Sequence, residues 1–220
     1  MTTPNIPARK RYGADDESMT DWFMAHKQQV GWAVLAIAII FAGVWYFERS
    51  QSLKRQRAET AYFQARQSAA AGNLPLATSD LQKVVSRYEG TNAGAQAAMT
   101  LAQLHFEQKK FKEGVDVLKA AQAMAPDDFK PSIHALEASG LEELKDFAGA
   151  AEQYKLAAEA TRFPADKAQY QASAARDYMA AGKTAEAKAI WTELAKDEAA
   201  PTAAEARVRL GELDAKPMKI

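Results

Sequence analysis

The sequence predicts an all-α protein, with one transmembrane helix followed by a solenoid of about four antiparallel helix pairs and a capping helix. Three observations support this fold class. Residues 30–47, VGWAVLAIAIIFAGVWYF, contain no charged side chain. The chain after residue 50 is rich in Ala, Leu, Glu, Lys and Gln, which are good helix formers. In that part a pattern of small and large side chains recurs about every 37 residues.

The apolar run has the length and the ends of a membrane span. Eighteen helical residues rise about 27 Å, close to the roughly 30 Å hydrocarbon core of a bilayer. Trp32 lies near one end, and Trp45 and Tyr46 lie near the other, where amphipathic rings prefer the headgroup zone. Ala36 and Gly43 are seven residues apart and share a helix face, which favours close packing against other membrane helices.

Two other interpretations of this run fit the sequence less well. A cleaved signal peptide is disfavoured because the polar lead-in is 29 residues long and carries four acids. In addition, no small-x-small cleavage site follows Phe47. A buried core helix is disfavoured because such helices usually keep a polar stripe, which this run lacks.

The charges on the two flanks do not orient the span. Lys/Arg bias in short flanks normally places the richer side in the cytoplasm. Four basic residues precede the run and four follow it: Arg9, Lys10, Arg11 and Lys27, then Arg49, Lys54, Arg55 and Arg57. The balance is even, so sidedness stays open on this criterion.

The predicted organisation has four parts. Residues 1–18 form a flexible tail, and residues 19–49 form a juxtamembrane segment and the transmembrane helix. Residues 50–213 form the repeat domain, and residues 214–220 form a loose tail. Residues 19–29 either extend the membrane helix backwards or form a short amphipathic helix on the membrane surface.

The repeat is visible in four segments that begin at Gly72, Lys109, Lys145 and Gly182, separated by 37, 36 and 37 residues. Small residues occur seven before and five after each start, and large residues occur nine after it. Small residues let two helices cross closely, and large ones fill the space between successive pairs. Each unit is therefore predicted to be a helix, a tight turn at its start residue, and a second antiparallel helix. A helix breaker then follows each unit: Gly90, Pro126, Pro164 and Pro201.

These columns resemble the tetratricopeptide repeat over roughly residues 58–200. In one unit Ala102, Phe111, Gly114, Leu118 and Ala121 match the family positions in order, followed by Pro126. The tryptophan expected at position 4 is absent from every unit, and the period exceeds the family's thirty-four. Residues 202–213 are expected to cap the stack, because a terminal repeat must hide its apolar face.

Composition and motifs indicate no enzyme. Lys plus Arg equals Asp plus Glu at 28 each, which gives no broad basic field for nucleic acid. The chain has no cysteine, and no metal-binding or phosphate-binding motif is recognisable. His105 and His134 fall at packing positions. Asp127 and Asp128 are expected to cap the helix after Pro126. No cofactor, metal or small-molecule substrate is therefore expected.

The resemblance implies a binding groove on the concave side, lined by the first helix of each unit. Family positions 2, 5, 9 and 12 face that groove, and their lining here is amide, hydroxyl and apolar, with few charges. It lacks the basic cluster that would clamp a peptide carboxylate, so a protein surface or extended segment is the expected ligand. The candidate residues are Gln96, Met99, Gln103, Phe106, Ser132, Ser139, Gln169, Arg176 and Met179, with Ala135, Glu142 and Ala172 at the remaining positions.

The whole layout also resembles the bacterial ancillary subunit of the Sec translocon, through the segment ERSQSLKRQRAETAYFQA that leads from the membrane into the first repeat. That resemblance implies a single-pass inner-membrane protein with a cytoplasmic N-terminus and periplasmic repeats. The implied partners are membrane-complex subunits, extracytoplasmic proteins or chaperones, and lipid around the one helix. Two alternatives stay open: a structural subunit of another large complex, such as a photosynthetic or respiratory assembly, and a tethered chaperone for unfolded clients.

Overall fold

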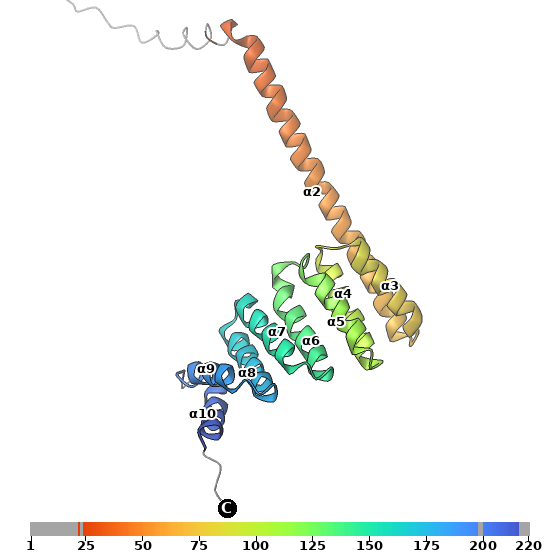
Figure 1. Cartoon of the computed structure of the whole chain (residues 1–220). Helices are drawn as coiled ribbons and strands as arrows, with labels where there is room; N and C mark the ends of the chain where they lie inside the picture. Colours follow the sequence, from red (N-terminus) through yellow and green to blue (C-terminus); the bar gives the residue numbers. More distant parts are fainter. Residues whose placement is uncertain (1–21, 23, 198–199, 216–220) are drawn as a thin grey trace, which may run out of the picture. The chain divides into compact units, whose positions relative to one another are not determined.

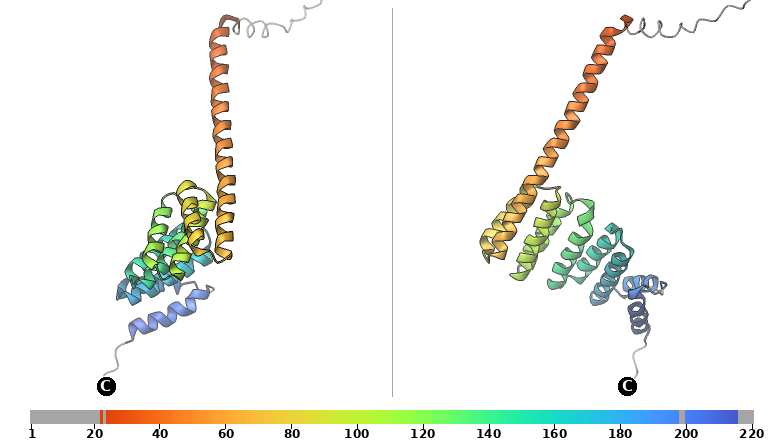
Figure 2. Two further views of the ribbon diagram at one scale, coloured as in Figure 1. Left: turned by 90° about the vertical axis from the view of Figure 1, so that its right-hand side faces the viewer. Right: turned by 180° about the vertical axis from the view of Figure 1, so that it is seen from behind.

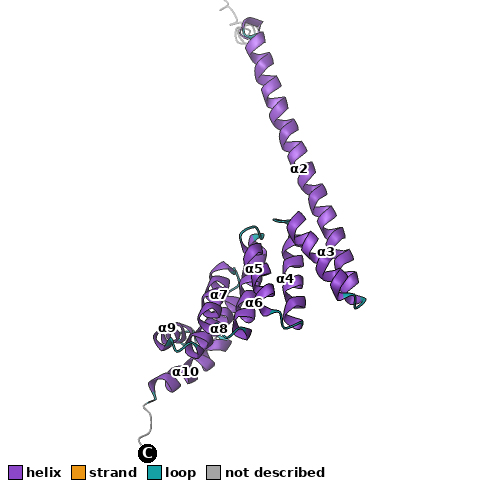
Figure 3. Cartoon of the chain, turned by 45° about the vertical axis from the view of Figure 1, so that its right-hand side comes forward, coloured by secondary structure: helices purple, strands orange, loops and turns teal. Residues whose placement is uncertain are grey.

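The computed structural model describes residues 22, 24–197 and 200–215, and all the regular structure in these residues is helical (Figure 3). The all-α prediction is confirmed. The predicted tail 1–18 and residues 216–220 lie outside the described residues. The helices are α2 (Lys27–Ala70), α3 (Leu74–Arg87), α4 (Asn92–Glu107), α5 (Phe111–Gln122), the 3₁₀ turn η1 (Asp127–Phe129), α6 (Lys130–Glu143), α7 (Phe147–Ala160), α8 (Pro164–Ala180), α9 (Thr184–Leu194) and α10 (Pro201–Asp214).

Contacts divide the chain into two units, Met1–Ser52 and Leu53–Ile220. The first unit contains the apolar part of α2, the one described helix that is long and apolar enough to cross a membrane. None of its 18-residue apolar window is buried. Trp32, Trp45 and Tyr46 are 66%, 67% and 72% exposed, and no atom lies within 4 Å of a β-carbon built on Gly43. Ala36 is exposed as well.

The second unit is a stack of helix pairs (Figures 1 and 2). The end of α2 pairs with α3, α4 with α5, α6 with α7, and α8 with α9, and α10 closes the stack against α9. These are the four predicted pairs and the predicted terminal helix.

The turn inside each pair depends on one residue with a left-handed backbone. These residues are the four predicted start positions: Gly72 (φ 78°), Lys109 (φ 59°), Lys145 (φ 64°) and Gly182 (φ 75°). At the last of them, the Gly182 amide donates to the Met179 carbonyl at 3.0 Å, and the Lys183 amide donates to the Tyr178 carbonyl at 2.8 Å. The other three turns repeat this pair of bonds, so each first helix ends in a Schellman motif.

The small residues of the repeat lie at the crossings of the paired helices. All eight are buried: Ala65, Ala102, Ala138 and Ala175 before the turns, and Ala77, Gly114, Ala150 and Ala187 after them. The large column is buried too, with Leu81, Leu118 and Trp191 at 0% exposed and Tyr154 at 9%. The apolar core is accordingly a chain of four clusters along the stack. Each pair is thus stabilised by its own crossing and by the pairs beside it.

The residues between units begin helices as well as ending them. Pro164 and Pro201 occupy the first position of α8 and α10, where the missing N–H costs no hydrogen bond. Asp127 and Asp128 do not cap α6, contrary to expectation. They lie inside η1, and neither η1 nor α6 receives a side-chain cap. The extra 3₁₀ turn separates them from the start of α6.

The left-handed turns predict that Lys109→Gly and Lys145→Gly each stabilise the fold by roughly 0.5–1 kcal/mol. Glycine removes the steric cost that a side chain pays at positive φ. This gain exceeds the loss from the greater backbone entropy that glycine gives the unfolded chain. The thermal midpoint of the full chain in mild detergent should rise. Gly182→Ala is the matched control and should lower it. A fall in the midpoint for both lysine variants would contradict the turn assignment.

Candidate protein-interaction surface

The first helix of each unit, together with α10, forms a row that we call the A-helices: the end of α2, then α4, α6, α8 and α10. Side chains connect members of this row across the stack. Tyr62 Oη and Thr100 Oγ1 lie 3.0 Å apart between α2 and α4. Arg176 Nη1 donates to both carboxylate oxygens of Glu205, at 2.9 Å each, between α8 and α10. The predicted groove residues lie on these helices, so the A-helices form the candidate surface.

On α4 the candidate residues differ in accessibility. Gln103 is exposed, whereas Gln96 and Met99 are half-buried. Met99 packs against the core cluster that contains Leu118 and Ile133. Gln103 is therefore the most accessible of the three predicted groove residues on this helix.

Phe106 is a packing residue. Its ring lies where side chains on α5 and α6 would otherwise extend. A β-carbon at Gly114 would lie 2.3 Å from Phe106 Cε1, and one at Gly140 would lie 2.5 Å from Phe106 Cζ. The ring thus fills the junction of α4, α5 and α6. Phe106 is half-buried, so these contacts show its packing role, and its place in the groove stays a prediction.

The two candidate serines on α6 lie in different surroundings. Ser139 Oγ donates to the Ala135 carbonyl at 3.3 Å and lies 3.3 Å from the Tyr154 hydroxyl. Ser132 lies at the other end of α6, in a surface pocket described below. Ser139 therefore contacts the Tyr154 hydroxyl of α7, whereas Ser132 lines the surface pocket.

On α8, Gln169 is exposed, and the other two candidates have partners inside the chain. Arg176 binds Glu205 and also donates from Nη2 to Ser173 Oγ at 3.0 Å. Met179 Sδ accepts a hydrogen bond from Trp191 Nε1 at 3.4 Å. Both side chains stabilise the terminal units, and Gln169 is the one most accessible to a partner.

Glu142 and Asp177 bring two acids together between α6 and α8. Asp177 is 6% exposed, and its Oδ2 has no hydrogen-bond partner. Burial, followed by the charge and hydrogen-bonding of Glu142, raises the pKa of Asp177 well above its usual range. Burial also raises the pKa of Tyr154, with added effects from both acids. Asp177 was not among the residues that the sequence singled out, and Glu142 was expected at a groove position.

A second buried acid, Glu137, lies between α5, α6 and α7. It is 0% exposed, Gln122 Nε2 donates to its Oε2, and its Oε1 has no partner. Gln153 Oε1 lies 2.8 Å from His134 Nδ1 and 3.4 Å from Gln122 Nε2, which completes a small polar network. Burial raises the pKa of Glu137 to about 7, and the charge of Lys119 acts in the opposite direction.

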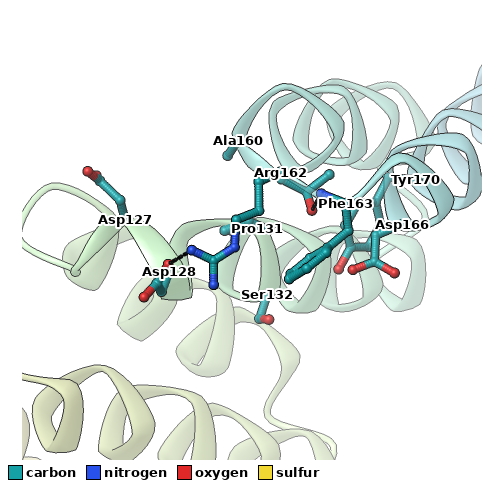
Figure 4. A pocket seen from close by; sticks show the side chains of 10 residues that line it. Asp127, Asp128, Pro131, Ser132, Ala160, Arg162, Phe163, Asp166 and Tyr170 are labelled. Carbon is teal, nitrogen blue, oxygen red and sulfur yellow. Dashed lines mark hydrogen bonds and ion pairs between the residues drawn. The ribbon is translucent and has the colours of Figure 1, made fainter.

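A surface pocket of about 330 Å³ lies between the start of α6 and the α7–α8 connection (Figure 4). Its lining includes Asp166, Phe163 and Ser132, and an ion pair joins Arg162 Nη1 to Asp128 Oδ1 at 3.2 Å. Both partners of this pair are 72% exposed, so water screens the interaction and it contributes little to stability. The pocket is a solvated edge of the stack.

No group of three or more His, Cys, Asp or Glu side chains among the described residues is arranged to hold a metal ion. His105 is half-buried, and its Nδ1 has no partner. Burial, with a smaller effect from the charge of Lys110, lowers the pKa of His105. His105 is thus half-buried at a packing position, as predicted, whereas His134 bonds to Gln153 in the polar network around Glu137.

The family model of the tetratricopeptide repeat-like domain matches residues 20–215. This chain belongs to that family. No curated protein matches the chain. Among solved structures, a Podosopora anserina protein with nearly identical TPR-like repeats is similar, with 17% identity, a TM-score of 0.53, and coverage of 71% of this chain and 84% of that one. BtubC (BKLC) from P. vanneervenii is similar with 15% identity, a TM-score of 0.50, and coverage of 74% and 68%.

At these identities the solved structures show the fold alone. Together with the family match, they establish a tetratricopeptide-like repeat solenoid, the architecture of a protein-interaction scaffold. This agrees with the sequence prediction at the level of fold. The identity of the partner is a separate question.

The buried acid predicts an unusual pH dependence of stability. The pKa of Glu137 in the folded state, about 7, lies above its ordinary value of 4.5, so ionisation penalises the folded state. The penalty is absent below about pH 4.5 and complete above about pH 7. Glu137→Gln should therefore stabilise the chain by roughly 1–3 kcal/mol at pH 8 and by little at pH 5.

The thermal midpoint of wild type and variant, measured at both pH values in the same detergent, tests this. Glu143→Gln, an exposed acid on the same helix, is the control and should leave the midpoint unchanged at either pH. Comparison with wild type cancels the other titrating groups. An equal stabilisation at pH 5 and pH 8 would show that Glu137 is not the titrating group.

Proposed function

We propose that this chain is a single-span membrane protein whose repeats act as an interaction scaffold on the extracytoplasmic side of a bacterial inner membrane. One observation carries the anchor: the apolar part of α2 is exposed along its length, and the same unbroken helix ends as the first helix of the repeats.

The free energy of that exposure favours a membrane over water. Six large side chains in the run are between 49% and 72% exposed: Val34, Leu35, Ile37, Ile39, Ile40 and Phe41. At roughly 2 kcal/mol each, their transfer out of water is worth on the order of 10 kcal/mol. That is comparable with the whole stability of a domain. The exposed apolar surface of the helix therefore favours contact with lipid over contact with water.

The finer assignment is an ancillary subunit of the Sec translocon. It is supported by the layout of tail, single span and repeats, and by the junction segment that leads from the span into the first repeat. On this assignment the N-terminal tail is cytoplasmic, and the repeats recruit extracytoplasmic proteins or chaperones to the translocon. The alternative is that the chain is an accessory subunit of another large membrane complex. The partner test below distinguishes the two assignments.

The absence of cysteine makes the topology directly testable, because any single introduced thiol is the only one in the chain. Thr3→Cys marks the N-terminal tail, and Ser86→Cys marks an exposed position on α3. A membrane-impermeant maleimide applied to intact spheroplasts should label Cys at position 86 only. Position 3 should be labelled only after the membrane is permeabilised. The reverse pattern would overturn the orientation, and release of the chain by alkaline carbonate would overturn the anchor.

The partner is tested by native purification from membranes in mild detergent through a C-terminal tag. Translocon subunits at a low and variable ratio are the expected result. One other large complex at a constant integer ratio would instead identify the chain as a structural subunit. The wild-type chain, which has no cysteine, is the reference in both experiments.

A further inference from the structure

The stack of helix pairs is closed at one end and open at the other (Figure 2). At the closed end α10 packs against α9, and its exposed side carries an ion pair between Arg209 Nη1 and Glu212 Oε2 at 2.9 Å. At the open end the last part of α2 packs into the core cluster that contains Ala65 and Leu81. No other described helix covers the far side of this part of α2, so that side is accessible to a partner.

The side of α2 that faces away from the stack is uncharged. Ala58 and Ala65 are fully buried, and a turn of about 100° per residue places six residues within about 50° of the opposite side of the helix. All six are exposed, and we call them the α2 seam: Leu53, Gln56, Thr60, Phe63, Gln67 and Ala70. The exposed charged residues of the same segment lie on the flanks of the seam: Arg55, Arg57, Glu59 and Arg66.

The spacing of the seam is that of a helix that packs along another helix. Its members follow one another at intervals that alternate between three and four residues, the spacing of the two contact positions in a coiled-coil heptad. Phe63 lies in the middle of the seam and is 62% exposed. An aromatic side chain in that place supplies the largest apolar contact that the seam can make with a partner.

The residue types of the seam fit a second copy of this chain. In a parallel pair with two-fold symmetry, each seam residue faces the same residue of the other copy. Leucine, phenylalanine and alanine can pack against themselves. Amides and hydroxyls both donate and accept hydrogen bonds, so Gln56, Thr60 and Gln67 can each bond to their own counterpart. A charged residue in the seam would meet an equal charge, and the seam contains none.

The flanks of the seam fit the same arrangement. In a parallel coiled coil, a residue on one flank faces the residue five positions later in the other helix. Glu59 then faces Gln64 of the second copy, and Ser52 faces Arg57. Neither contact brings equal charges together. A partner of different sequence does not require a seam of self-pairing residues, whereas a second copy does.

The proposed membrane anchor supplies the orientation and the concentration. Copies that insert in the same direction hold their α2 helices parallel, and confinement to one bilayer raises their effective concentration. Polar residues at heptad contact positions lower the stability of a pair and fix its register. The pair therefore depends on the membrane as well as on Phe63 and Leu53.

We infer that the α2 seam is the interface of a parallel dimer of this chain, in which residues 53–70 of two copies pack side by side. This inference rests on the proposed membrane anchor and names one partner of the scaffold, a second copy. The dimer closes the open end of each stack, as α10 closes the other end.

The test uses single cysteines in the full chain in its membranes, because the wild-type chain has none. Gln56→Cys, Thr60→Cys and Gln67→Cys lie in the seam, and Glu59→Cys and Arg66→Cys are exposed controls on its flanks. A disulfide requires Cα atoms roughly 4.4–6.8 Å apart, which only the seam positions satisfy in the dimer. Mild oxidation should give a species of twice the chain mass at the three seam positions, at least about tenfold faster than at the two flank positions.

A second substitution in the Thr60→Cys chain tests the role of Phe63. Phe63→Glu places two carboxylates opposite each other and should slow the cross-link at least about tenfold. Val208→Glu changes a residue of α10 that is 61% exposed and should leave the rate unchanged. Circular dichroism and the thermal midpoint of each purified chain establish that it is folded.

Three results contradict the dimer. Equal rates at seam and flank positions would mean random collision in the membrane. A seam cysteine that joins a different protein would assign this face to that protein. Cross-linking at the seam that Phe63→Glu does not slow would exclude packing through Phe63.

Failure of this inference is distinguishable from failure of the proposed function. If seam and flank cysteines do not differ while the chain resists alkaline carbonate and captures its membrane partner, the dimer is wrong and the anchored scaffold stands. If carbonate releases the chain, the anchor itself fails.

Discussion

The close crossing of two helices in each unit is the constraint on which the rest of this stack depends. Alanine or glycine occupies the crossing on both helices in all four pairs, so the backbones can approach. Small side chains bury little apolar surface, and the stabilisation must come mainly from larger residues placed between successive pairs. Leu81, Leu118, Tyr154 and Trp191 supply it, one per unit. Each of these side chains packs against the next helix pair, so no unit buries its apolar surface alone. The last unit therefore needs the terminal helix α10 to cover its large residue.

The repeat register made the turns predictable where residue preference did not. Gly72 and Gly182 adopt a left-handed backbone at no steric cost, whereas lysine disfavours that conformation. Lys109 and Lys145 were nevertheless predicted to be turn residues because they align with the two glycines, and their φ angles of 59° and 64° confirm it. The same register located the buried columns. A period shared by four units thus carries more information than the propensity of any single residue.

What the sequence did not reveal depends on contacts between different units. Asp177 meets Glu142 from a position 35 residues away, and Glu137 meets side chains of two other helices. A periodic pattern of apolar residues assigns charged ones to solvent, so it cannot identify an acid that a neighbouring unit covers. The packing of Phe106 was missed for the complementary reason: its helix position indicates the groove, but Gly114 and Gly140 leave a space that its ring fills.

The two buried acids among the described residues are Glu137 on α6 and Asp177 on α8, and Glu142 on α6 is half-buried. Glu137 and Glu142 are five residues apart, which is about 140° around an α-helix. One acid therefore faces α5 and α7, and the other faces α8. Stacking alone requires neither, because alanine occupies the buried positions Ala172 and Ala174 on α8 without any charge. Burial of an acid lowers the stability that stacking provides, here in the third unit, whose helix α6 carries Glu137.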